Sequence, residues 1–142
     1  MNAVERKLVE EYKKLDLQME DLLGTKNGVT SYIRAMEAEK IAASSIPGWK
    51  EDLGMLKHLR HVRNMIMHED GDSRCRKADA DEVEKFMKRL RDRDDPLARL
   101  KKKRKKKGRR KIGKKDKGAP GKIWPLILIL IAVILLLALK NR

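Results

Sequence analysis

The sequence has a single cysteine, Cys75, and aromatic residues make up only 4% of its 142 residues. One cysteine allows no intramolecular disulfide and no multi-cysteine metal site, which fits a reducing compartment. The chain also has no His-x-x-x-His pair with a third ligand and no glycine-rich phosphate loop. The sequence therefore predicts no metal centre and no cofactor, and the few aromatic residues predict a thin core of modest stability.

No segment alternates between polar and apolar residues over any length, so strands are not expected. Apolar residues recur instead every three or four positions, which predicts helices over residues 4–22, 30–45 and 53–68, and a fourth from residue 79. Gly24 should end the first helix, and Asp79 with Glu82 should form a capping box for the fourth. The expected fold is all-α, a small antiparallel, up-and-down four-helix bundle spanning residues 1–95.

Acidic residues are almost absent from the last third of the chain. Residues 1–95 contain 19 Lys and Arg against 20 Asp and Glu, whereas residues 96–142 contain 17 against 1, so the net charge of +15 lies outside the bundle. Residues 96–122 form a basic linker. Within it, residues 101–117 repel one another and cannot bury apolar surface, which predicts disorder or at most a transient helix in solution. Three interpretations stay open: a topology signal alone, contact with anionic lipid, or capture of RNA by counterion release. The candidate contact residues are Lys101, Lys102, Lys103, Arg104, Lys105, Lys106, Lys107, Arg109, Arg110 and Lys111.

Charged residues are missing altogether from residues 123–139, which read IWPLILILIAVILLLAL. As a helix this segment extends roughly 25 Å, near the short end of the range that spans a bilayer. The basic residues lie mainly before the segment, which places residues 1–95 on the cytoplasmic side and the short tail of residues 140–142 across the membrane. We expect a single-pass, tail-anchored protein of the cell membrane, because the first twenty residues show no signal peptide.

The third expected helix ends with the pattern Arg63-Asn64-x-x-x-His68. Histidine can transfer the protons that metal-independent RNA cleavage requires, and a guanidinium group can hold the phosphate through two hydrogen bonds. Asn64 lies four residues before His68, on the same helix face, where its amide could orient the imidazole. Arg63 and His68 are about 140° apart around an ideal helix, so they converge on one phosphate only across a dimer cleft or where the last turn unwinds.

In this pattern, and in its place late in the third of four helices, residues 1–95 resemble the HEPN family. The resemblance implies a metal-independent endoribonuclease in a defence or toxin-type role. It further implies that His68 is the acid or base, that Arg63 is the phosphate clamp and that Asn64 orients the histidine or the RNA substrate. It also implies a homodimer with the motif at its interface, and a protein partner or antitoxin.

Two alternatives remain at this point. The three residues can be an ordinary polar helix end, with Arg63 paired to Glu69 or Asp70 and His68 favourable to the helix dipole. The bundle is then a non-catalytic adaptor, anchored to the membrane, whose basic linker contacts anionic lipid headgroups. His58 and His61 are expected to be solvated.

Overall fold

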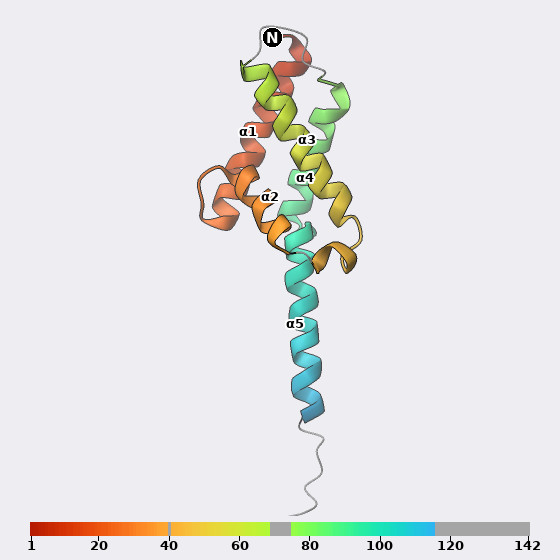
Figure 1. The fold of residues 1–142 in the computed structure, drawn as a ribbon. Helices are drawn as coiled ribbons and strands as arrows, with labels where there is room; N and C mark the ends of the chain where they lie inside the picture. The colour runs from red at the N-terminus through yellow and green to blue at the C-terminus, as the bar shows by residue number, and fades with distance from the viewer. Residues whose placement is uncertain (40, 69–74, 116–142) are drawn as a thin grey trace, which may run out of the picture. The chain divides into compact units, whose positions relative to one another are not determined.

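The structure, a computed structural model, describes residues 1–39, 41–68 and 75–115, without the side chains of residue 43 and of residues 111–115. These residues contain no strand, which confirms the prediction of an all-helical bundle (Figure 1). A first compact unit runs from Met1 to Lys103. The elements in chain order are α1 (Ala3–Leu23), α2 (Gly28–Ala38), the 3₁₀ turn η1 (Ala42–Ser44), α3 (Trp49–His68), α4 (Lys77–Arg91) and α5 (Pro96–Lys115).

Helix α1 has a defined cap at each end. The Asn2 side chain accepts a hydrogen bond from the Glu5 N–H at 2.9 Å, and the Glu5 carboxylate accepts one from the Asn2 N–H at 2.7 Å. This reciprocal pair satisfies two N–H groups that a helix start leaves without partners. At the other end Gly24 takes a left-handed conformation with φ 64° and donates its N–H to the Glu20 carbonyl, as the sequence predicted.

The second helix starts beside the middle of the first, because the four residues between them double back. The Val29 N–H donates to the Asp16 carboxylate at 2.7 Å, and the Asn27 N–H donates to the Glu20 carboxylate at 2.7 Å. A Cβ atom on Gly28 would lie only 2.0 Å from the Asp16 carbonyl oxygen. Only glycine therefore allows α2 to begin in contact with the backbone of α1.

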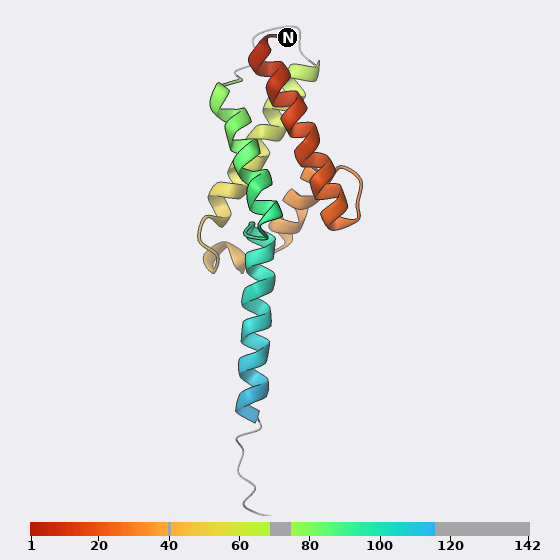
Figure 2. The same cartoon turned by 180° about the vertical axis from the view of Figure 1, so that it is seen from behind.

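The position of this start sets the relative directions of the helices, which differ from the predicted ones. Lys7 pairs with Glu84 at 2.9 Å, and Gln18 reaches the Met87 carbonyl at 3.5 Å, so α1 and α4 are parallel neighbours. In Figures 1 and 2 α2 runs the same way and only α3 runs opposite to the other three. The expected up-and-down antiparallel order is wrong, because α2 leaves the turn at Gly28 in the direction of α1.

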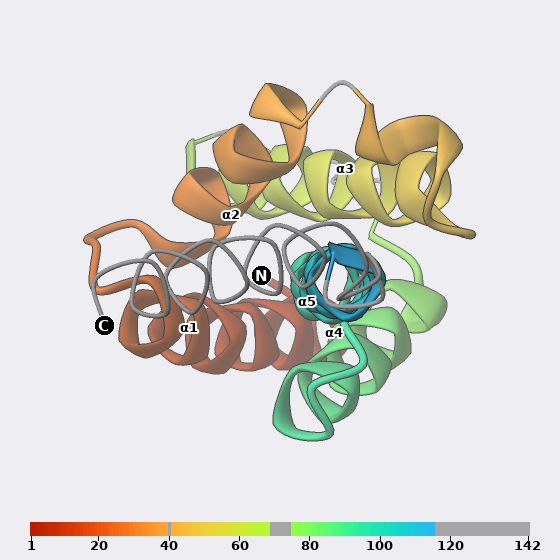
Figure 3. The same ribbon diagram turned by 90° about the horizontal axis from the view of Figure 1, so that it is seen from below.

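All four helices contribute to one core, and Figure 3 shows them around it from below. The side chains of Tyr32 and Phe86 meet edge to face with ring centroids 5.8 Å apart, which joins α2 to α4. The expected buried face of α4 is confirmed, whereas Val4 and Leu22 at the ends of the α1 stripe are not buried. The largest fully buried side chains are Trp49, Tyr32, Phe86, Leu8, Leu15, Met19, Ile33, Met36, Leu56, Leu59, Val29 and Val83.

Two predicted boundaries are corrected by the structure. The helix expected over residues 30–45 ends at Ala38, and η1 follows it before the turn at Pro47 and Gly48. Helix α4 starts at Lys77, so Asp79 lies inside the first turn and accepts a hydrogen bond from the Arg76 N–H at 2.8 Å. Asp79 thus caps the start of α4 by accepting the N–H of Arg76, the residue before the helix. Glu82 takes no part in this cap.

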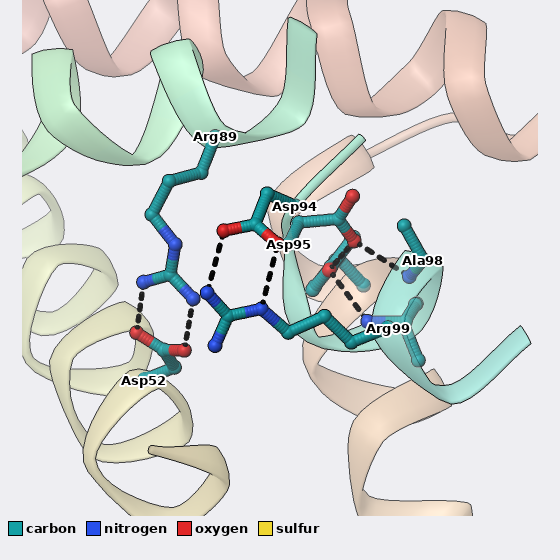
Figure 4. Close-up of polar contacts among 8 residues, drawn as sticks. Asp52, Arg89, Asp94, Asp95, Ala98 and Arg99 are labelled. Carbon is teal, nitrogen blue, oxygen red and sulfur yellow. Dashed lines mark hydrogen bonds and ion pairs between the residues drawn. The ribbon is translucent and has the colours of Figure 1, made fainter. Parts of the chain in front are cut away.

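The largest correction concerns the basic linker, because residues 96–115 form helix α5. Asp95 caps its start: the carboxylate is 2% exposed and accepts hydrogen bonds from the Ala98 N–H at 3.1 Å and from the Tyr32 hydroxyl (Figure 4). Leu97 and Leu100 pack on the core, and Lys and Arg are themselves good helix formers. The expectation of disorder is therefore wrong for residues 101–115, since it considered the repulsion among basic residues without the contacts that hold the start of the helix.

No helix within the described ranges is long and apolar enough to cross a membrane. The segment expected to do so, residues 123–139, lies outside the described residues, as do the rest of the linker beyond residue 115 and the tail.

Candidate functional site

The motif residues Arg63 and Asn64 lie together on α3. The Arg63 guanidinium donates a hydrogen bond to the Asn64 side-chain oxygen at 3.1 Å. Arg63 is half-buried and Asn64 is exposed. This bond fixes one edge of the guanidinium group and leaves the amide N–H₂ of Asn64 able to donate to a ligand.

The guanidinium group of Arg63 also packs over the ring of Tyr12 of α1. The Arg63 guanidinium carbon lies 5.9 Å from the centre of the buried Tyr12 ring, a cation–π arrangement. The pKa of Tyr12 is raised to about 12, mainly by burial and also by the charge of Asp16, whereas Arg63 and Arg60 act to lower it. The Tyr12 hydroxyl thus stays neutral at physiological pH although two arginines lie near it. The contact between Tyr12 and Arg63 was not predictable from the spacing of residues in the sequence.

His68 lies one turn after Asn64 on α3 and on a different face of the helix from Arg63. His68 is the last described residue of α3 and is exposed, and it makes no hydrogen bond to Arg63 or Asn64 in the part of the chain that the structure describes. His58, expected to be solvated, instead lies 3.3 Å from the fully buried carboxylate of Asp79. Glu69 and Asp70, the carboxylates suggested for Arg63, are outside the described residues.

Helix α5 presents the second candidate surface. Residues 101–110 are all exposed, and the basic side chains among them meet no acidic residue within α5. Lys111 belongs to the same helix, without a described side chain. Lys103 Nζ donates to the Ser45 carbonyl at 2.7 Å, which fastens the start of this surface to the turn after η1. The exposed basic side chains of residues 101–110 give this part of α5 a surface of one charge sign that a polyanion could contact.

Two arginines near the start of α5 each pair with a carboxylate through two hydrogen bonds, and neither pair was predicted from the sequence. Arg89 of α4 donates to Asp52 of α3 twice at 2.7 Å, and Arg99 donates to Asp94 at 3.0 and 2.5 Å (Figure 4). Hydrogen bonding to Asp52 is the main cause that raises the pKa of Arg89. Asp52 could have been noticed, because it falls on the apolar stripe that includes Trp49 and Leu56.

A family model described as "Family of unknown function (DUF6548)" matches residues 6–119. The match covers most of the chain, so the protein belongs to this family. No curated protein and no solved structure matches it. Membership assigns no activity, and the residues described above carry the functional argument.

Proposed function

We propose that this protein is a membrane-tethered helical adaptor, in which α5 lies on anionic lipid headgroups and the bundle at the cytoplasmic face binds a protein partner. The observation that supports the proposal is the exposed surface of α5, where every residue from position 101 to 107 is Lys or Arg. The uncharged run of residues 123–139 supports the tether.

Electrostatics favours an anionic surface for α5. Every basic residue from Lys101 to Lys111 has another basic residue three or four positions away, and like-charge pairs at that spacing each cost roughly 0.2–0.5 kcal/mol. Each Lys or Arg close to an anionic leaflet gains about 1 kcal/mol. Anionic lipid headgroups should therefore attract α5, and contact with them should also reduce the repulsion among its basic side chains.

Lysine labelling in proteoliposomes tests this proposal. The full-length protein is reconstituted in phosphatidylcholine, with and without phosphatidylglycerol, and treated with an amine-acetylating reagent. We expect Lys101–Lys107 to be labelled several-fold more slowly when phosphatidylglycerol is present, and high salt to abolish the protection because it screens the attraction. Lys85 and Lys88, which are exposed on α4, are the reference and should react equally in both membranes. Equal labelling of α5 in both membranes would refute the lipid contact.

A second candidate function is metal-independent RNA cleavage by the motif of α3. It is favoured by the exposure of Asn64 and His68, which lie one turn apart at the surface, with Arg63 bound to Asn64. Because His68 and Arg63 do not meet within the chain, cleavage requires a two-fold dimer that joins the motifs of two protomers.

Incubation of the full-length protein with single-stranded RNA in EDTA tests the second candidate. We expect cleavage by the wild type and at least a hundredfold slower cleavage by His68→Ala, as for loss of a general acid or base. His61→Ala is the matched control on the same helix and should retain activity. No cleavage by the wild type, or equal cleavage by His68→Ala, rejects the enzymatic function.

A further inference from the structure

Among the side chains that the structure describes, the half-buried basic residues are four arginines: Arg60, Arg63, Arg89 and Arg99. Every described lysine is exposed. A charge that is partly removed from water needs a counter-charge or good hydrogen bonds to offset the lost hydration. The molecule meets this need in two of the four cases, with the paired carboxylates of Asp52 and Asp94.

The other two arginines, Arg60 and Arg63, have no carboxylate within ion-pair distance in the described ranges. They are three residues apart on α3, which makes them neighbours on one helix face, about 5–6 Å apart at Cβ. The polar contact of Arg63 in the described ranges is Asn64, and the ring of Tyr12 lies beneath its guanidinium group. Two adjacent like charges are thus half-buried, and neither forms an ion pair with a carboxylate in the described ranges.

The nearby carboxylates are engaged elsewhere. Asp16 of α1 accepts the Val29 N–H at 2.7 Å, and Glu37 of α2 pairs with Lys57 at 2.6 Å. The hydrogen bond from Lys57 is the main cause that lowers the pKa of Glu37, whereas Arg60 contributes only through its charge. Neither of these two carboxylates therefore forms an ion pair with Arg60 or Arg63.

We propose that Arg60 and Arg63, with Asn64 beside them, form the docking point for an acidic segment of a partner protein. This inference rests on the proposed adaptor function and specifies that the partner protein presents carboxylate side chains. Carboxylates fit because the chain itself satisfies its other two half-buried arginines with carboxylates in two-pronged geometry. A phosphate group fits less well, since the pair lies in the middle of α3, where the backbone N–H groups are already used within the helix.

Binding of a labelled helical peptide that carries two glutamates one turn apart tests the inference. The full-length protein is held in nanodiscs of phosphatidylcholine, and the variant Arg60→Gln/Arg63→Gln is compared with Lys85→Gln/Lys88→Gln. The control removes the same charge from two exposed residues with the same spacing on α4. We expect the arginine variant to bind at least tenfold more weakly and the control to change affinity less than twofold.

Three outcomes would overturn the inference. These are equal losses in the two double variants, undiminished binding of a peptide with glutamine in place of glutamate, and tighter binding of single-stranded RNA that the arginine variant alone abolishes. The last result would make the pair a phosphate site. Arg60→Gln alone keeps the contact between Arg63 and Tyr12, so it provides a folded variant in which several-fold weaker binding is still expected.

The peptide assay is independent of the lipid contact of α5. Failure of the adaptor's membrane placement would appear as unprotected lysines on α5 in the labelling experiment. The arginine variant should retain that protection, because it leaves α5 unchanged.

Discussion

Gly28→Ala should destabilise the protein by about 3 kcal/mol, because it forces a methyl group into the backbone of α1. The added Cβ would lie 2.0 Å from the Asp16 carbonyl oxygen and 2.6 Å from the Glu20 nitrogen. Backbone atoms cannot yield as a flexible side chain does, so α2 must move away from α1 and lose core contacts. Urea unfolding followed by circular dichroism measures the change.

Gly54→Ala is the matched control on α3. A Cβ at Gly54 meets nothing within 4 Å, so alanine brings its helix propensity without a clash and should stabilise the protein by about 0.5–1 kcal/mol. The two substitutions are chemically identical and should shift the free energy of unfolding in opposite directions. The close start of α2 on α1 would be contradicted if Gly28→Ala were as stable as Gly54→Ala.

Asp95→Ala should cost about 3 kcal/mol and reduce the helicity of α5, since one side chain serves two purposes. Its carboxylate caps α5 at the Ala98 N–H and accepts the hydrogen bond of the Tyr32 hydroxyl. Burial is the main cause that raises the pKa of Tyr32 above its ordinary value, with Asp95 adding to it. Without Asp95 the buried hydroxyl loses its acceptor.

The exposed Asp92→Ala is the control, and a second substitution separates the two roles of Asp95. Tyr32→Phe should cost much less in the Asp95→Ala background than in the wild type, because the hydroxyl no longer has an acceptor to lose. Circular dichroism reports helix content, and urea unfolding reports stability. Unchanged helicity in Asp95→Ala would show that α5 forms without this cap.

The helices of the bundle were predictable because their apolar stripes are regular. The stripe through Leu8, Tyr12, Leu15 and Met19 predicted α1, and Gly24 predicted where it ends. The directions of α2 and α4 relative to α1 were not predictable, because they depend on how closely α2 starts against the backbone of α1 at Gly28. No periodicity within one segment contains that information.

Helix α5 shows a different limit of sequence reasoning. The repulsion among its lysines was visible in the sequence, but the buried Asp95 and the leucines that anchor the first turn act through contacts with distant residues. Tyr32, the partner of Asp95, is 63 positions away along the chain. A local tendency toward disorder was therefore outweighed by tertiary structure.

The candidate site was predictable in part. Helical spacing predicted the separation of Arg63 from His68 around the helix, and α3 is helical through His68 in the structure. Neither the contact of Arg63 with the ring of Tyr12 nor the lack of an ion pair at Arg60 among the described residues was predictable. Both depend on which side chains of α1 and α2 face α3 after folding.

The most direct test of the membrane-surface account is fluorescence quenching by spin-labelled lipid. A fluorophore is attached to Lys106→Cys, in a background where the single cysteine has been replaced by Cys75→Ser, and the full-length protein is placed in bilayers with headgroup spin labels. The account predicts strong quenching when phosphatidylglycerol is present, reversal by high salt, and little quenching of the same fluorophore at Lys85→Cys on α4. Equal quenching at the two positions, or quenching at residue 106 that ignores lipid charge and salt, would contradict it.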